Sequence, residues 1–105
     1  MRAKAEKCFY YNFGDKKYTE ISGYRWEYKN HTYFTLKYKS EKGSWAVIEA
    51  KSGLWIAKEY SRKNVEDLAI KNIDGSEAVG KSITVLSEKW ILENGISPLY
   101  APKAA

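Results

Sequence analysis

The sequence predicts an α+β fold: an antiparallel β-meander of three to five strands followed by two helices packed on one face of the sheet. Two observations predict it. Apolar and aromatic residues alternate with polar ones over residues 24–59, which is the period of a half-buried strand, and the period changes to that of an amphipathic helix after Ser61. A length of 105 residues suits a single domain, expected over residues 1–97, with a frayed tail over 98–105.

The strands are expected where Tyr, Trp, Phe, Val, Ile and Thr are concentrated, because these side chains suit a pleated, half-buried surface. Polar segments that contain Asn30, Gly43 or Gly53 separate these runs and have the composition of hairpin turns. The expected strands are residues 24–28, 32–39, 45–50 and 54–59, with two earlier ones near 7–13 and 18–21.

The first helix is expected over residues 62–72. Ser61 is a good N-cap, and apolar residues recur on one face at Val65, Leu68 and Ala69. Asp74 and Gly75 should end this helix, because glycine readily adopts the left-handed conformation found at helix C-termini.

A second helix is expected over residues 82–94, with Asn94 and Gly95 as its stop. Its start is open. The β-branched run at 83–86 would also fit a short strand, with a helix only from Ser87.

Composition excludes several classes of protein. The chain is 44% hydrophobic and 30% charged and has two prolines, which excludes disordered and collagen-like chains. Its longest apolar runs fall far short of the roughly 20 residues of a membrane span, so we expect no membrane association. A single cysteine, Cys8, cannot form an internal disulfide, which fits the reducing environment of a cytoplasmic protein.

Positive charge and aromatic residues are concentrated in the first part of the chain. Residues 1–63 hold 14 Lys and Arg, 7 Asp and Glu, and 14 of the 16 aromatic residues, for a net charge of +7. Residues 64–105 hold 4 Lys and Arg and 6 Asp and Glu, for a net charge of −2. A negatively charged partner would therefore bind the part that is rich in Tyr and Trp.

Residues 75–82 read GSEAVGKS, a literal match to the pattern of a phosphate-binding P-loop. A P-loop follows a buried parallel strand, but the residues before Gly75 have helical period, and no aspartate follows Asp74 to hold a metal ion. The residues after Ser82 are too few for the strand and helix units of that fold. We therefore expect a loop between two helices and no nucleotide.

No spacing in the sequence assembles a catalytic group or a metal site. His31 is the only histidine and lies in an expected turn, so a nucleophile and a carboxylate would have to reach it across the fold. Cys8 is expected to be a small packed hydrophobic residue. We therefore expect a protein that is not an enzyme and uses no cofactor.

Alternation along the strands places aromatic and basic residues together. One row is expected to meet the helices: Phe34, Leu36, Tyr38, Ala46, Ile48, Ala50, Leu54 and Ile56. Rings and cations then share the outer face, where bases can stack while phosphates are neutralised. This pattern predicts nucleic-acid binding with little sequence specificity through Arg25, Tyr33, Lys37, Lys39, Trp45 and Trp55.

The segment WAVIEAKSGLWIAKEYSRKNVEDLAIKNI, residues 45–73, resembles the three-stranded sheet and helix of AP2-like and integrase arm-type DNA-binding domains. The shared features are a tryptophan that opens a strand, a turn with glycine, and a Ser-capped helix with a charged first turn. The resemblance implies that DNA is read through the sheet, which again points to Lys37, Lys39, Trp45 and Trp55.

Two other interpretations remain open. The rings could instead form cross-strand pairs or pack beneath the N-terminal segment, with the lysines at the rim. Alternatively, the protein is a small accessory or inhibitory protein of the kind found on phages and mobile elements, and its Tyr- and Trp-rich surface binds a host protein. Lysines clustered on the aromatic face favour nucleic acid, whereas lysines at the rim favour a protein partner.

Overall fold

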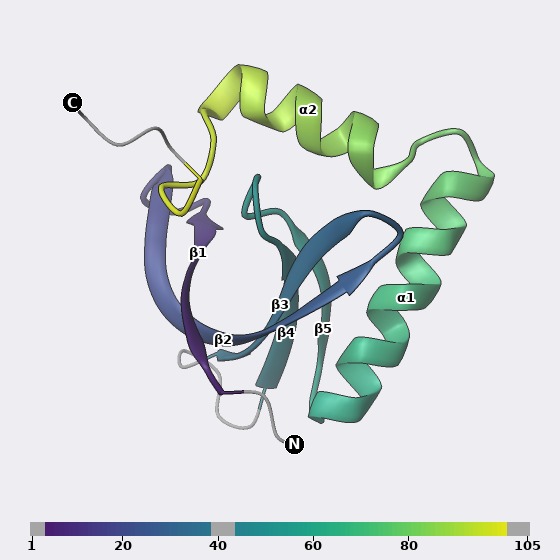
Figure 1. Cartoon of the computed structure of the whole chain (residues 1–105), viewed down its shortest axis with the longest axis horizontal. Helices are drawn as coiled ribbons and strands as arrows, with labels where there is room; N and C mark the ends of the chain where they lie inside the picture. Colours follow the sequence, from purple (N-terminus) through teal and green to yellow (C-terminus); the bar gives the residue numbers. More distant parts are fainter. Residues whose placement is uncertain (1–3, 39–43, 101–105) are drawn as a thin grey trace.

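The computed structural model, which describes residues 4–38 and 44–100, has the expected α+β fold (Figure 1). Within these residues, five antiparallel strands lie side by side in chain order, and two helices follow them. No helix in the described part of the chain is long and apolar enough to cross a membrane. The elements are β1 (Glu6–Asn12), β2 (Lys17–Tyr28), β3 (His31–Tyr38), β4 (Ser44–Glu49), β5 (Trp55–Glu59), α1 (Arg62–Ala78) and α2 (Ile83–Asn94).

The strand β2 joins two expected strands, 18–21 and 24–28, into one. Its hairpin to β3 has only two turn residues, Lys29 and Asn30, and both have positive φ. This is the geometry of a tight hairpin whose twist matches its strands. His31 was expected in the turn, but it is the first residue of β3.

The first helix is longer than expected. α1 continues through Asp74 and Gly75 to Ala78, because the glycine with left-handed backbone is Gly80, at φ 79°. A contact with the sheet holds this last part of the helix, since the Tyr28 hydroxyl donates to Asp74 Oδ1 at 2.9 Å.

Residues 75–82, the segment that matches the P-loop pattern, were expected to form a loop between two helices, but only residues 79–82 do so. Residues 75–78 form the end of α1, and Ser82 is the N-cap of α2, accepting a hydrogen bond from Val85 N at 3.3 Å. The second helix begins at Ile83, so the alternative of a short strand at 83–86 is wrong.

The sheet bends where β2 changes partners. β2 pairs with β1 as far as Gly23 and with β3 from Tyr24 onward. β1 and the first half of β2 therefore curve away from β3, β4 and β5, on the left in Figure 1. The strand β1 then meets the β4–β5 turn, where Tyr11 N donates to Gly53 O at 3.1 Å. Gly53 has φ 68°, and a Cβ there would lie 2.8 Å from Tyr11 N, so the contact requires glycine.

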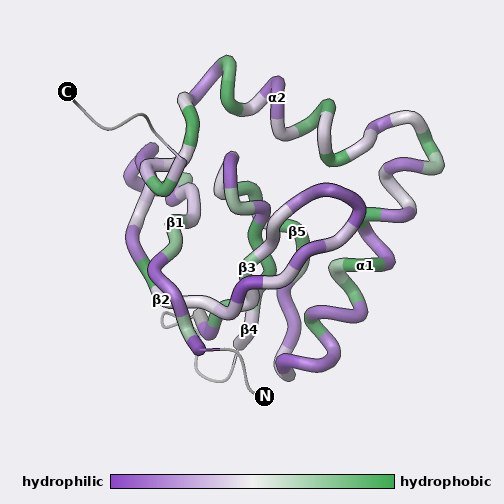
Figure 2. Tube along the Cα trace, viewed as in Figure 1, coloured by the Kyte–Doolittle hydropathy of each residue, from purple (hydrophilic) through white to green (hydrophobic). Residues whose placement is uncertain are grey.

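Both faces of the central strands are buried. The helix-side face packs Tyr33, Val47 and Ala57 against Val65, Ala69, Ile73 and Ile83 of the two helices. The opposite, strand-covered face packs Phe34, Leu36, Ala46, Ile48 and Ala50 beneath β1 and β2, together with Cys8. In Figure 2 hydrophobic segments occur along the central strands, and α1 alternates between hydrophilic and hydrophobic segments.

The expected assignment of these two faces was wrong for β3 and β4. Phe34, Leu36, Ala46, Ile48 and Ala50 were expected to meet the helices, but they lie on the face that β1 and β2 cover. From the row expected to be outer, Tyr33 and Trp45 instead lie on the helix side, with Tyr33 in its core. On β5 the expectation for Ile56 is confirmed, since it packs against the helix-side core, whereas Trp55 packs against the strand-covered cluster. Both rows are apolar enough to be buried, so alternation identifies the rows without saying which one the helices cover.

Candidate functional site

Tyr33, one of the expected binding residues, is 0% exposed. Its ring stacks on that of Trp26, with 5.0 Å between the ring centroids, within the helix-side core. Burial raises the pKa of its hydroxyl, with a further contribution from the negative charge of Glu49. A ring enclosed in this way has no free face for a ligand, so Tyr33 is a packing residue.

The Trp55 side chain also contacts other residues of the fold. Its Nε1 donates to Tyr11 O at 3.0 Å, and its ring meets that of Tyr10 edge to face, with 5.2 Å between centroids. The interpretation that rings pack beneath the N-terminal segment therefore holds for Trp55. Arg25 lies 3.4 Å from the Glu6 carboxylate at the start of β1, away from the helix side. Lys39 lies outside the described residues.

Lys37 and Trp45 remain together at the surface. They are direct cross-strand partners on β3 and β4, and Lys37 is exposed while Trp45 is half-buried. Both line a cleft of about 790 Å³ at the end of the sheet. Its other walls come from β1 and β2 and include Tyr10, Thr19, Glu20 and Tyr24. Two of the six expected residues thus share an open aromatic site.

The first turn of α1 adds cations beside this cleft. The Arg62 guanidinium lies 4.0 Å from the centroid of the Tyr24 ring, a cation–π contact. Lys63 follows it and is exposed, and this turn carries no acidic residue. The N-terminus of a helix is already the positive end of its dipole, and Lys63 adds a further positive charge there, whereas Glu66 lies 3.7 Å from Arg62 and partly balances its charge.

Hydrogen bonds fix this turn on the sheet. Glu66 Oε2 lies 3.7 Å from Arg62 Nε and accepts from Thr35 Oγ1 at 2.7 Å. Thr35 Oγ1 in turn accepts from Trp26 Nε1 at 2.8 Å. Glu66 therefore links Arg62 to the buried Thr35 hydroxyl, which fixes the position of Arg62 relative to the sheet.

Sequence reasoning missed Tyr24 and Arg62 as candidate site residues. The local signal was the basic pair Arg62–Lys63 directly after the N-cap Ser61, where acidic residues are the favoured choice. That signal becomes meaningful only when α1 is known to start beside the Trp45 end of the sheet, as the pairing of Trp45 with Glu59 places it.

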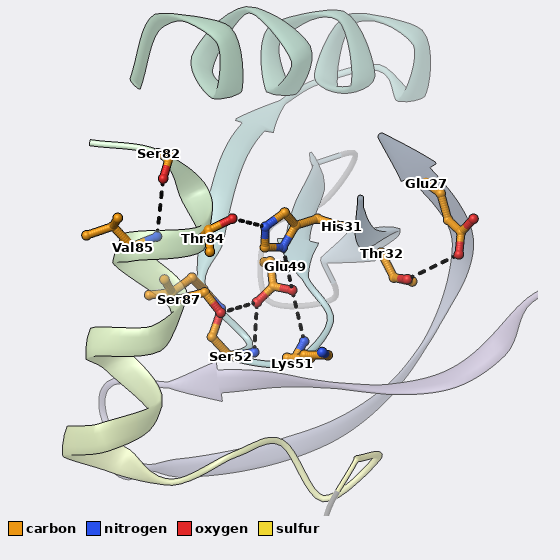
Figure 3. A network of polar contacts seen from close by, with 11 residues as sticks. Glu27, His31, Thr32, Glu49, Lys51, Ser52, Ser82, Thr84, Val85 and Ser87 are labelled. Carbon is orange, nitrogen blue, oxygen red and sulfur yellow. Dashed lines mark hydrogen bonds and ion pairs between the residues drawn. The ribbon is translucent and has the colours of Figure 1, made fainter. Parts of the chain in front are cut away.

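A second polar cluster lies at the other end of the helix-side face (Figure 3). Glu49 is 1% exposed, and its Oε1 accepts from Ser52 N, Ser52 Oγ and Ser87 Oγ at 3.0, 2.7 and 2.8 Å. Its Oε2 accepts from Lys51 N at 3.2 Å. These donors satisfy a carboxylate that would otherwise be costly to bury. Because Ser87 belongs to α2, the cluster also ties that helix to the sheet.

A neighbouring surface cluster joins the β2–β3 turn to α1. Lys29 Nζ lies 2.8 Å from Asp74 Oδ1 and 3.1 Å from Glu77 Oε2. Hydrogen bonds from Lys29 and Tyr28 lower the pKa of Asp74, and those to Asp74 and Glu77 raise the pKa of Lys29. The cluster holds the end of α1 on the hairpin and leaves its charges paired.

Comparisons with known proteins add no assignment: no protein-family model, no curated protein and no solved structure matches this chain. Among residues 4–38 and 44–100, no group of three or more His, Cys, Asp or Glu side chains is arranged to hold a metal ion. Of the six residues expected to bind, Lys37 and Trp45 are the two that line one cleft of the described structure together.

Proposed function

We propose that the protein binds single-stranded nucleic acid, with little sequence preference, in the cleft at Lys37 and Trp45. The observation that carries this proposal is the cross-strand pair itself, an exposed ammonium group directly opposite a half-buried indole ring. A base can stack on the ring while the ammonium group neutralises the adjacent phosphate. Proteins that bind single strands without reading their sequence combine these two contacts.

The surrounding charges determine where the phosphates of a bound strand can lie. Glu59 lies beside Trp45 on β5, and Glu20 is part of the cleft wall, so phosphates are disfavoured at both positions. Lys37, Arg62 and Lys63 supply positive charge. We therefore infer that the phosphates follow these cations while bases enter the cleft and stack on Trp45 and Tyr24.

The cleft also has a suitable size and lining. Its volume of about 790 Å³ falls within the range of roughly 300–1,000 Å³ typical of ligand sites. Paired bases cannot reach a ring inside a cleft without first being unstacked, which costs a few kcal/mol. A preference for single strands over duplexes follows from this geometry.

The proposal is tested by titrating a labelled mixed-sequence single strand with the protein at several salt concentrations, with anisotropy as the signal. Trp45→Leu should cost about 1–3 kcal/mol of binding free energy with little change in salt dependence. Lys37→Gln should lower the slope of log affinity against log salt by about 1. The two substitutions therefore have different signatures.

Matched controls are available in the same chain. Lys71→Gln removes an exposed lysine from α1, about 13 Å along the helix from Arg62, and should leave the slope unchanged. Trp55→Leu should lower thermal stability rather than change the affinity of the folded protein. Absence of binding at 50 mM salt, or equal slopes for the Lys37 and Trp45 variants, would refute the mechanism. Salt-insensitive capture of a host protein would instead favour the protein-binding alternative.

A further inference from the structure

Three residues that are distant in the sequence meet beside the first turn of α2. Thr84 Oγ1 of α2 lies 2.7 Å from His31 Nε2, at the start of β3. His31 Nδ1 lies 3.6 Å from Glu49 Oε2, at the end of β4 (Figure 3). A hydroxyl, an imidazole and a carboxylate in this order form the arrangement that activates a hydroxyl as a nucleophile, and it is recognised by geometry rather than by sequence position.

The buried carboxylate sets the proton on the imidazole. Glu49 Oε1 is saturated by Ser52 and Ser87, so Oε2 is the oxygen turned toward His31. A carboxylate facing Nδ1 favours the tautomer with hydrogen on Nδ1, which leaves a lone pair on Nε2. His31 Nε2 then accepts the hydrogen bond that Thr84 Oγ1 donates.

The hydroxyl of this group is open to a substrate. Thr84 is exposed, whereas the side chain of His31 is 17% exposed and that of Glu49 is 1% exposed. Thr84 also belongs to the first turn of α2, the positive end of a helix dipole, where negative charge is stabilised. An oxyanion that forms next to Thr84 Oγ1 therefore lies in a favourable field.

We propose that Thr84 is the nucleophile of an acyl-transfer site for activated esters, with His31 as its general base and Glu49 as the positioning residue. Thr84 Oγ1 attacks the carbonyl carbon while its proton passes to His31 Nε2. The bond to the leaving oxygen then breaks, that oxygen takes the proton from His31, and an acyl-Thr84 ester remains. Water, deprotonated by His31, attacks this ester, releases the carboxylic acid and restores the Thr84 hydroxyl.

The test uses p-nitrophenyl acetate, with release of nitrophenolate followed by absorbance and the acetylated residue located by peptide mass spectrometry. We expect acetyl on Thr84. Thr84→Val should abolish this label, and Thr84→Ser should retain it. His31→Gln should slow it at least about tenfold, because a positioned general base contributes about 10²–10⁴-fold. Thr32→Val is the matched control, since the Thr32 hydroxyl bonds to Glu27 instead of an imidazole. Its rate should equal that of the wild type.

A spectroscopic measurement tests the role of Glu49 independently of any rate. Nitrogen-15 chemical shifts of neutral His31 should report the Nδ1–H tautomer in the wild type. Glu49→Gln should shift it toward Nε2–H, because the amide nitrogen then faces Nδ1 as a donor. Acetyl found on His31, a lysine or a tyrosine in place of Thr84, or the Nε2–H tautomer in the wild type, would overturn the proposal.

Discussion

The two faces of the central strands are both buried, but their chemistry differs. The strand-covered face is a cluster of aliphatic and aromatic side chains with the Cys8 thiol. The helix-side face mixes rings with hydrogen-bonded polar groups, including Thr35 and Glu49. Apolar burial has no directional requirement, whereas each hydrogen bond fixes the relative position of two groups. The first face therefore supplies mainly stability, and the second also determines where functional side chains lie.

Both candidate sites use side chains from the helix-side rows of the central strands, although the other walls of the nucleic-acid cleft come from β1 and β2. The nucleic-acid cleft uses Lys37 and Trp45 from those rows, next to the start of α1. The Thr84 and His31 pair lies at the start of α2. Helix starts on a polar-lined face combine positive dipole ends with fixed side chains, which the strand-covered face does not offer.

The largest expected change in stability comes from truncating a large side chain in the strand-covered face. Phe34 is 1% exposed and lies in the core cluster beneath β1 and β2. Phe34→Ala should lower the free energy of unfolding by about 3–5 kcal/mol, through lost apolar burial and the cavity that remains. Urea denaturation measures this change, with Phe13→Ala, an exposed phenylalanine, as the control. A loss below about 1 kcal/mol would contradict the assigned core.

The next largest change in stability is expected in the helix-side face. Glu49→Ala should cost about 3 kcal/mol, because it leaves the buried donors of Ser52 and Ser87 without their acceptor. Glu49→Gln should cost less, since its amide oxygen can still accept from both serines. Urea denaturation of the two variants separates these cases. Equal losses for Ala and Gln would show that volume rather than hydrogen bonding matters at this position.

The junction between the two faces is sensitive at Gly23, where the sheet bends. A Cβ at this residue would lie 3.1 Å from Cys8 Sγ and 3.2 Å from Thr35 O. Gly23→Ala should therefore destabilise the protein by about 1–3 kcal/mol through overpacking. Gly75→Ala is the matched control, because a Cβ there meets nothing within 4 Å, and it should be neutral or stabilising within helix α1. Thermal unfolding that gives both variants the same Tm would contradict this difference.

The smallest expected effect is a pH dependence of stability that comes from Cys8 in the strand-covered face. Burial raises the pKa of the Cys8 thiol from 9.0 to about 12, with a smaller contribution from Glu6. The unfolded chain releases this proton first as pH rises, so stability is full below pH 9 and falls between pH 9 and 12. From pH 8 to pH 10 the wild type should lose about 1 kcal/mol more than Cys8→Ala. Parallel curves for the two proteins would contradict burial of the thiol.

Part of the candidate cleft could be predicted from the sequence. Period two placed Lys37 and Trp45 in the same row, and the pairing of β3 with β4 puts them directly opposite each other. Tyr24 and Arg62 belong to other elements, and their contact depends on where α1 begins relative to β2. The Thr84 and His31 contact spans 53 residues, so no local spacing could indicate it.

The sequence by itself determined the element types, the meander order and the concentration of positive charge in residues 1–63, because each depends on neighbouring residues. It also determined that β3 and β4 have two apolar rows. Only the tertiary structure decided which row the helices cover, because the bend at Gly23 brings β1 over one face and leaves the other to α1. The same long-range packing buried Tyr33 and Trp55, left Lys37 and Trp45 accessible, and brought Glu49, His31 and Thr84 together.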